Sequence, residues 1–324
     1  MHAFHPPPHL AHPVVQTMAG SLRWRARGLT ALERSTFFKI IETGAGVKLQ
    51  AAVSRPASGR GPLVILLHGW EGSANSAYIV TTARFLFENS WHVVRLNLRD
   101  HGATHHLNTG LFYASRLDEV CDSIVHICRK WRGLPIILCG FSLGGNFALR
   151  TALRLSIGRS RIPNLAHVVA VSPVIDPAKT TKAVDNTRLI RSYFLFKWRK
   201  SLIKKQQAHP GRYDFGRIIK MDRIETITAA LLERYSPFEN TEAYFDTYTL
   251  TGDRLGPIRI PTTILTAADD PIIPVEDIYG LRTGPAVRKI VLRRGGHNGF
   301  VRGLSKGAWY FDCLKKLGER AMRI

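Results

Sequence analysis

A chain of 324 residues with 45% hydrophobic and 22% charged residues has the composition of a globular protein, which excludes wholesale disorder, a collagen and a coiled coil. The formal net charge of +22 fits a nucleic acid, an anionic membrane or an anionic substrate as partner, or simply a basic surface. No apolar run approaches the roughly 18 to 20 residues that span a bilayer, and the first residues lack the pattern of a signal peptide. We therefore expect a cytoplasmic protein whose cysteines are buried free thiols in a reducing compartment. These are Cys121, Cys128, Cys139 and Cys313.

Short apolar runs alternate with helix-length amphipathic segments along much of the chain. The first two expected strands, at 37–42 and 47–54, form a hairpin through a turn at 43–46. Further strands are expected at 63–67, 92–98, 136–140, 165–172, 262–267 and 289–292, and helices at 77–88, 115–131, 143–155 and 303–317. This alternation predicts an α/β fold with a mostly parallel central sheet and helices on both of its faces.

The alternation is interrupted between about 176 and 257, where helical, charged and aromatic sequence replaces the strands. We therefore divide the chain into an N-terminal arm at 1–30, a core at 31–175, a helical lid insertion at 176–257 and the rest of the core at 258–324. Lids close over reaction centres and exclude water, so the insertion predicts an active site beneath it. In the N-terminal arm, histidines at positions 2, 5, 9 and 12 lie among prolines, which we interpret as a loose segment.

The strongest chemical motif is G-x-S-x-G at 140–144, with Ser142 at its centre. An expected strand precedes the motif and an expected helix follows it, as a strained nucleophile turn requires, and the flanking glycines let strand and helix approach closely. The N-terminus of that helix offers unpaired N–H groups and a positive dipole end to a developing oxyanion. The alternative is a glycine-rich turn in which the serine takes no part. We favour Ser142 as a nucleophile.

The loop after the expected strand at 63–67 begins His68-Gly69-Trp70. In hydrolases whose nucleophile is the serine of a G-x-S-x-G turn, that loop and the residue after the nucleophile each supply one oxyanion-hole N–H. We therefore nominate the backbone N–H groups of Trp70 and Leu143. His68 could act as a base, but we favour a structural histidine that shapes the loop, because a better base exists later in the chain.

Candidates for the acid and the base follow the last strands. Asp269 and Asp270 come after the expected strand at 262–267, and the D-x-x-x-P frame favours Asp270 as the carboxylate that orients a histidine. His297 lies among glycines after the final strand, where we expect a mobile backbone and little steric cover. The order Ser142, Asp270, His297, each just past a strand, is the order that α/β-hydrolases require.

With these motifs the chain resembles the YheT-like branch of the α/β-hydrolase-domain proteins, from about residue 12 to residue 317. The matching stretches are 12–17, 67–73, 140–146, 269–271 and 295–300. The resemblance implies an esterase-like serine hydrolase whose relatives act on lipid or short acyl esters. One departure stands at 99–106, Arg-Asp-His-Gly-Ala-Thr-His-His, where relatives carry a glycine-rich loop. We expect this segment to border the pocket, so the relatives' substrate preference does not carry over.

Two weaker signals have competing interpretations. Asp100, His101, His105 and His106 are of metal-ligating types, but their spacing fits no standard site and serine hydrolysis needs no metal. The segment 191–205 interleaves aromatic and aliphatic residues with lysines and arginines. We favour an ordinary lid helix there and keep contact with an anionic membrane as the alternative; nucleic acid is not expected, because no such motif is present.

The sequence thus predicts a serine hydrolase that cleaves carboxylic esters, of acyl or lipid kind, through Ser142, His297 and Asp270 and an acyl-enzyme intermediate. No cofactor is needed for this chemistry. The alternative is a non-catalytic protein on the same fold that binds a lipid or a partner at an anionic membrane surface.

Overall fold

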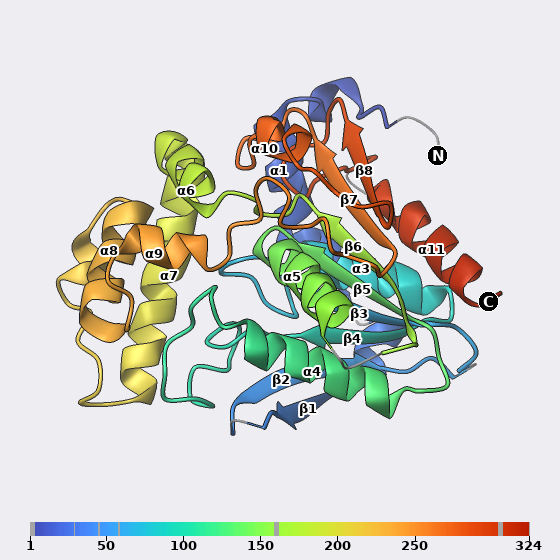
Figure 1. Ribbon diagram of the computed structural model, residues 1–324, viewed down its shortest axis with the longest axis horizontal. Coiled ribbons are helices and arrows are strands. Elements are labelled where there is room, and N and C mark those ends of the chain that lie inside the picture. Colours follow the sequence, from blue (N-terminus) through green and yellow to red (C-terminus); the bar gives the residue numbers. More distant parts are fainter. Residues whose placement is uncertain are drawn as a thin grey trace.

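The computed structural model describes residues 4–28, 30–44, 46–57, 59–158, 162–303 and 307–323, and within them one eight-stranded sheet forms the centre of the molecule (Figure 1). Its strands, in spatial order, are β1 (Thr36–Glu42), β2 (Lys48–Ser54), β4 (His92–Leu96), β3 (Leu63–Leu67), β5 (Ile136–Phe141), β6 (Leu165–Val171), β7 (Thr262–Ala267) and β8 (Val287–Leu292). The pairs β1–β2 and β2–β4 are antiparallel, and all the other neighbours are parallel. The predicted α/β fold class is confirmed, as is the edge hairpin, although Ala45 of its turn lies outside the described residues.

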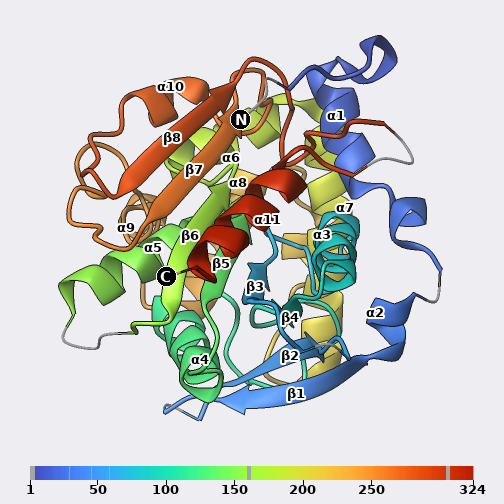
Figure 2. The same ribbon diagram turned by 90° about the vertical axis from the view of Figure 1, so that its right-hand side faces the viewer.

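Two hydrophobic cores lie on the two faces of the sheet. All five residues of β3 are fully buried, because a central parallel strand is covered on both faces and reads as a continuous apolar run. Leu63, Ile65 and Leu67 point into one core, and Val64 and Leu66 into the other. On the first face lie α4 (Leu117–Lys130) and α5 (Leu143–Ile157), and on the second α3 (Ala77–Glu88) and α11 (Tyr310–Ala321), as Figure 2 shows.

The helical insertion leaves the sheet after β6 and returns at β7. It contains α6 (Pro177–Asn186), α7 (Arg188–Ala208), a 3₁₀ turn at Ile218–Lys220, α8 (Ile224–Tyr235) and α9 (Thr241–Asp246), and it projects to one side of the sheet (Figure 1). The buried carboxylate of Asp185 accepts hydrogen bonds from the Ile224 and Glu225 N–H groups at 2.8 and 3.1 Å. It thereby joins the end of α6 to the start of α8. A short helix, α10 (Val275–Tyr279), follows β7.

The prediction of a loose N-terminal arm is wrong for the described part of that segment. It forms 3₁₀ turns at Pro8–Leu10 and Arg23–Ala26 and the helix α1 (Pro13–Ser21), followed by α2 (Ala31–Arg34). Proline at the first helical position and the Nδ1 of His12, which accepts from the Val14 N–H at 3.3 Å, start α1. Leu10 and Ala19 pack against Val301, so the segment is fixed to the core. His2 lies outside the described residues.

Other differences from the predicted elements have local causes. The final helix begins at Tyr310, later than predicted, because Val301 and Ala308 form an antiparallel bridge before it. The strand β4 ends at Leu96 because the Leu98 N–H donates to the His68 ring and not to a neighbouring strand. Cysteines 121, 128 and 139 are buried free thiols as predicted, whereas Cys313 is only partly buried. In the described parts of the chain, none of the helices has the length and apolar character needed to cross a membrane.

Candidate active site

Ser142 occupies the sharp turn between β5 and α5. Its backbone has φ 55° and ψ −119°, a conformation that is costly for any residue with a side chain. Space explains the glycines beside it: a Cβ on Gly140 would lie 2.1 Å from the Gly144 oxygen, and one on Gly144 would lie 2.5 Å from the oxygens of Leu67 and His68. The two glycines of the G-x-S-x-G pattern therefore let β5, α5 and the end of β3 pack closely together while Ser142 faces the cavity.

Asp270 and His297 form a buried pair at the carboxyl edge of the sheet. The His297 Nδ1 lies 2.9 Å from Oδ2 and 3.1 Å from Oδ1 of Asp270, and both side chains are almost fully buried. Oδ1 also accepts from the N–H groups of Ile272 and Ile273 at 2.9 and 3.0 Å, which fixes the carboxylate. Because a carboxylate accepts, the imidazole donates from Nδ1 and keeps Nε2 as its basic nitrogen.

The adjacent carboxylate of Asp269 has a different partner. Its Oδ1 accepts from the Gly296 N–H at 2.9 Å, one residue before His297. Burial raises the pKa of Asp269, and the backbone N–H groups of Gly295 and Gly296 oppose that shift. The geometry therefore brings Asp270, and not Asp269, to the imidazole, while Asp269 supports the histidine loop.

The expectation that His297 has little steric cover is wrong. Its side chain is 6% exposed. A Cβ on Gly296 would meet the Pro13 oxygen at 2.4 Å, and one on Gly299 would meet the Gln16 oxygen at 2.5 Å. The glycines around His297 permit close packing against α1.

The elements that carry Ser142, Asp270 and His297 meet at one edge of the sheet. The three residues follow β5, β7 and β8, whose carboxyl ends lie on the same side because the strands are parallel. Between them, the Ser142 N–H donates to the Val171 oxygen at 2.9 Å, and the Asn298 N–H donates to the Ser172 hydroxyl at 3.4 Å. The end of β6 is thus in contact with both the serine turn and the histidine loop.

The loop after β3 lies directly against the serine turn. A Cβ on Gly69 would be 3.1 Å from the Ser142 Cβ, and the Gly69 N–H donates to the Tyr78 hydroxyl at 2.9 Å. Trp70 stacks on Phe194 of the lid, with ring centroids 5.2 Å apart and planes 14° apart. Within the described residues, the N–H groups of Trp70 and Leu143 donate to no protein acceptor, as an oxyanion site requires.

His68 has the structural role that we favoured. Its Nδ1 donates to the Gly69 oxygen at 2.8 Å, and its Nε2 accepts from the Leu98 N–H at 3.1 Å. Burial lowers the pKa of His68 to about 4, so the ring is neutral near pH 7. Both nitrogens are used in joining the ends of β3 and β4, and neither is available as a base.

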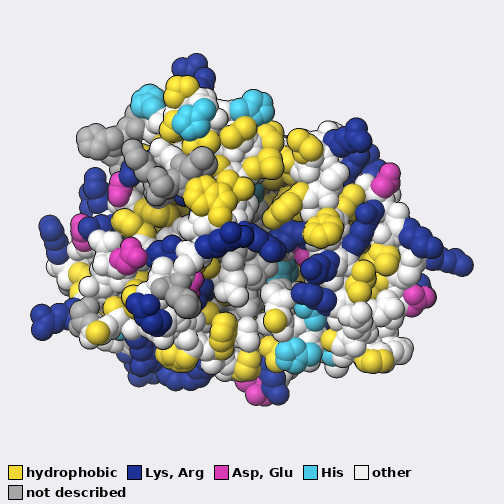
Figure 3. All heavy atoms as spheres, turned by 180° about the vertical axis from the view of Figure 1, so that it is seen from behind, with side chains coloured by type: hydrophobic (Ala, Val, Ile, Leu, Met, Phe, Trp, Pro, Cys, Tyr) yellow, Lys and Arg dark blue, Asp and Glu magenta, His cyan; other side chains and the backbone are white. Residues whose placement is uncertain are grey.

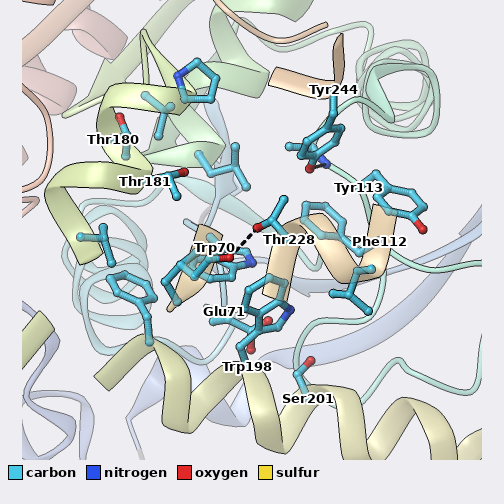
Figure 4. Close-up of a pocket in the computed structure, with 18 of the residues that line it drawn as sticks. Trp70, Glu71, Phe112, Tyr113, Thr180, Thr181, Trp198, Ser201, Thr228 and Tyr244 are labelled. Carbon is cyan, nitrogen blue, oxygen red and sulfur yellow. Dashed lines mark hydrogen bonds between the residues drawn. The ribbon is translucent and has the colours of Figure 1, made fainter. Parts of the chain in front are cut away.

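Next to Ser142 lies a cavity of about 150 Å³ between the sheet edge and the lid (Figure 4). Its walls are mostly apolar and come in similar measure from the core and the lid. The lid contributes Val184, Phe194, Trp198, Leu202, Leu231 and Tyr244. The polar side chains of the lining include Glu71, Ser201 and Thr228, which Figure 4 shows around the same space. Such a lining suits an apolar group attached to a reacting centre at Ser142.

The segment 99–106 borders this cavity through Asp100 and His101, as predicted. Asp100 pairs with Lys205 of α7, and the ring of His101 packs between His68 and Phe112. The His105 Nε2 lies 2.9 Å from the Ser201 hydroxyl. No group of three or more His, Cys, Asp or Glu residues in the described segments has an arrangement that could hold a metal ion.

Sequence reasoning missed three residues that shape the site. Thr17 accepts a hydrogen bond from the His297 N–H, Lys205 ties the lid to the core, and Glu71 lines the cavity beside Trp70. Thr17 lies in the stretch 12–17, which resembles the YheT-like proteins, but sequence reasoning assigned this stretch no role. Lys205 gave no signal of its own, because a lysine in a basic helix is ordinarily solvated.

A mostly parallel sheet with a strained serine after β5, a histidine–carboxylate pair beyond it and a helical insertion above defines an α/β-hydrolase. The comparison with known families agrees: the chain belongs to the alpha/beta hydrolase fold family, which matches residues 62–304.

Curated relatives are distant. "Putative esterase YheT" of Escherichia coli (strain K12) is 22% identical over 75% of this chain and 71% of its own length. "Abhydrolase domain-containing protein 2" of Drosophila melanogaster is 22% identical over 74% of this chain, which spans 64% of that relative's length. Among solved structures, the Pyrococcus furiosus esterase Pf2001 superposes with a TM-score of 0.56 at 17% identity, covering 91% of this chain and 97% of Pf2001. These likenesses show an α/β-hydrolase with esterase-like relatives.

Proposed function

We propose that this protein is a serine hydrolase that cleaves carboxylic esters, with Ser142, His297 and Asp270 as its catalytic triad. The observation that carries the proposal is the buried His297–Asp270 pair, with Nδ1 held by the carboxylate, at the sheet edge that also bears the strained Ser142 turn. The esterase-like relatives support the reaction class.

In the proposed reaction, the Ser142 Oγ attacks the ester carbonyl while the His297 Nε2 takes the hydroxyl proton. The N–H groups of Trp70 and Leu143 stabilise the oxyanion, helped by the N-terminal end of the α5 dipole. Collapse of the tetrahedral intermediate breaks the bond to the alcohol oxygen, which receives the proton from His297. Water then attacks the acyl-enzyme in the same way and releases the acid and the free serine. Asp270 holds the imidazole tautomer and stabilises its charged form throughout.

The cavity supports an apolar acyl group as the part of the substrate that is recognised. Most of the wall surface that faces the cavity is apolar, so an apolar group gains by burial there, whereas a polar group would lose part of its hydration. We therefore propose acyl or lipid esters as the substrate class.

The test uses a fluorophosphonate probe and a series of p-nitrophenyl esters of rising chain length. We expect wild-type protein to be labelled and to hydrolyse the esters, and Ser142→Ala to lose the label and at least 10³-fold in kcat. Ser192→Ala, an exposed serine of α7, is the matched control and should behave as wild type. Turnover that persists in Ser142→Ala would overturn the mechanism. A wild-type protein that binds esters without cleaving them or reacting with the probe would favour the non-catalytic alternative.

We propose further that the outer face of α7 contacts anionic membrane surfaces from the cytoplasmic side. This helix carries seven Lys and Arg residues and no Asp or Glu among its 21 residues. Four large apolar side chains stand exposed along one face: Leu189 (69%), Tyr193 (48%), Phe196 (67%) and Ile203 (42%). Figure 3 shows basic and hydrophobic side chains next to one another on the lid side of the molecule. This face of α7 fits an anionic bilayer, because its apolar side chains can enter the membrane interface and its cations can contact the anionic headgroups.

Sedimentation with vesicles tests this contact. Binding to vesicles that contain phosphatidylserine should exceed binding to vesicles of pure phosphatidylcholine. It should weaken at 0.5 M salt, because the electrostatic screening length is already only about 10 Å at about 0.1 M salt and is shorter at 0.5 M. Lys200→Glu with Lys204→Glu should abolish it, as should Leu189→Ser with Phe196→Ser. Arg129→Glu with Lys130→Glu makes the same charge change at the exposed end of α4, outside the lid. Equal losses for the α4 and α7 charge variants, or no binding by wild type, would contradict a docking role for α7.

A further inference from the structure

The histidine loop is held from the side by the N-terminal helix, some 280 residues earlier in the chain. The His297 N–H donates to the Thr17 Oγ1 at 2.9 Å. That hydroxyl in turn donates to the Pro13 oxygen at 2.8 Å, within α1. Because its one proton is already committed to Pro13, the Thr17 oxygen presents a lone pair to the backbone of His297.

A second side chain of α1 pairs with the same loop four residues further on. The Gln16 Nε2 donates to the Val301 oxygen at 3.2 Å, and its Oε1 accepts from the Val301 N–H at 2.8 Å. Gln16 is fully buried. It thus satisfies both backbone groups of Val301, as a neighbouring strand would, in a place where the sheet provides none.

The loop backbone between these anchors is strained. Asn298 and Phe300 have φ values of 59° and 48°, in the region that side-chain-bearing residues seldom adopt. A non-glycine backbone persists there only where its surroundings hold it. Gly296 and Gly299 leave room for α1 to approach closely enough to do so.

We propose that Thr17 and Gln16 are positioning residues for His297, so that α1 is part of the catalytic site. The inference rests on the proposed serine-hydrolase function and gives the stretch 12–17 a role. Asp270 fixes the orientation of the ring from one side, and Thr17 fixes the position of the backbone from which the ring extends. A base displaced by a fraction of an ångström loses its alignment with the serine hydroxyl, whereas substrate binding in the lid cavity is unaffected.

The variant Thr17→Val keeps the shape of the side chain and removes the acceptor. We expect kcat and the rate of fluorophosphonate labelling to fall about tenfold or more while KM stays within twofold. Thr17→Ser, which restores the oxygen, should recover most of the loss. Thr81→Val is the matched control, because the Thr81 hydroxyl makes the same bond to the oxygen four residues back, at 2.9 Å, but supports no catalytic loop.

A proton NMR signal provides a readout that does not depend on activity. The Nδ1 proton that His297 shares with Asp270 should give a strongly downfield resonance, assigned by its absence in His297→Gln. We expect it to broaden or vanish in Thr17→Val and to persist in Thr17→Ser and Thr81→Val.

The outcomes separate this inference from the proposed function. An active, labelled wild type with Thr17→Val equal to it in kcat and in the imidazole resonance would overturn the positioning role alone. A wild type without turnover or labelling would overturn the proposed function instead. Should Thr17→Val fail to fold, Gln16→Met, which keeps the length of the side chain and loses both hydrogen bonds to Val301, is measured in its place. The same lowered kcat with unchanged KM is expected, and wild-type kcat would count against the inference.

Discussion

Asp100 and Lys205 form an ion pair at 2.7 Å beside the cavity, and their side chains are almost fully buried, at 7% and 1% exposed. Asp100 follows β4 and Lys205 belongs to the lid helix α7, so the pair joins the lid to the core. The same ammonium group donates to the oxygens of Asn108 and Gly110 at 2.7 and 3.0 Å. All three protons of Lys205 therefore have acceptors. The segment from Asp100 to Gly110 is thus the part of the core to which the lid helix is attached.

Removing the cation should destabilise the protein strongly. Lys205→Met leaves Asp100 charged and buried without its partner, at an expected cost of about 3–5 kcal/mol in the free energy of unfolding. Urea denaturation measures this cost. The double variant Asp100→Asn with Lys205→Met should be more stable than Lys205→Met, because no charge is then stranded. The control is Arg254→Met, which removes an exposed ion pair with Asp246 and should change the free energy of unfolding by less than about 1 kcal/mol. An equally small effect of Lys205→Met would show that the Asp100–Lys205 pair does not hold the lid.

The two adjacent aspartates should differ sharply in catalysis. Asp270→Asn gives the His297 Nδ1 an amide partner and favours the wrong tautomer, so kcat should fall by about 10³–10⁴. Asp269→Asn keeps an acceptor oxygen for the Gly296 N–H and should lower kcat by less than about tenfold. Steady-state kinetics on one p-nitrophenyl ester compares them. Equal effects from both variants would remove the distinction that the geometry draws.

Glu71 should give the enzyme an alkaline limit. Burial raises the pKa of Glu71 to about 8, with Lys197 acting in the opposite direction, so the carboxyl group is neutral at pH 7. Above pH 8 it becomes a negative charge in the cavity beside Trp70, whose N–H we propose as part of the oxyanion site. We expect kcat/KM to fall as the pH rises through about 8 and expect Glu71→Gln to abolish that fall.

The raised pKa of Glu71 should also make the stability of the protein depend on pH. The unfolded chain releases the Glu71 proton near the ordinary pKa of a glutamate, whereas the folded protein keeps it up to about pH 8. Between these two pKa values the unfolded state binds fewer protons than the folded state. The contribution of Glu71 therefore lowers the free energy of unfolding as the pH rises. Glu71→Gln should therefore raise the melting temperature more at pH 9 than at pH 5. An equal effect at both pH values would mean that Glu71 is ionised throughout.

The parts of the fold that the sequence predicts well are those set by neighbouring residues. The strand at 63–67 and the helix at 77–88 match the structure at both ends, because an apolar run or an amphipathic period is bounded by residues that break it. The turn at Ser142 was equally readable, since strand, glycines and helix lie within one short stretch. Each of these signals is local, so a single sequence contains all of it.

Other features depend on contacts between distant segments. Pro13 and the histidines near it suggested a loose arm, and nothing nearby shows that Thr17 meets His297 across 280 residues. Asp269 and Asp270 are chemically alike neighbours, and only the path of the loop decides which one reaches the imidazole. Lys205 was indistinguishable from the solvated lysines of the same helix until the segment at 99–106 was placed against it.

Filling the cavity from the lid should shorten the acyl chain that the enzyme accepts. Thr228 of α8 lines the cavity, and within the described residues its hydroxyl bonds only to the Ile224 oxygen of the same helix, at 2.8 Å. Thr228→Phe therefore costs no hydrogen bond to the core. The added ring occupies a large part of about 150 Å³ of space. We expect kcat/KM for a p-nitrophenyl octanoate to fall at least tenfold and that for the acetate to stay within about threefold, since differences of a few methylene groups in a pocket carry such factors. Thr226→Phe, on the exposed face of the same helix, is the control and should leave the chain-length profile unchanged. An unchanged profile in Thr228→Phe as well would place the acyl chain outside this cavity.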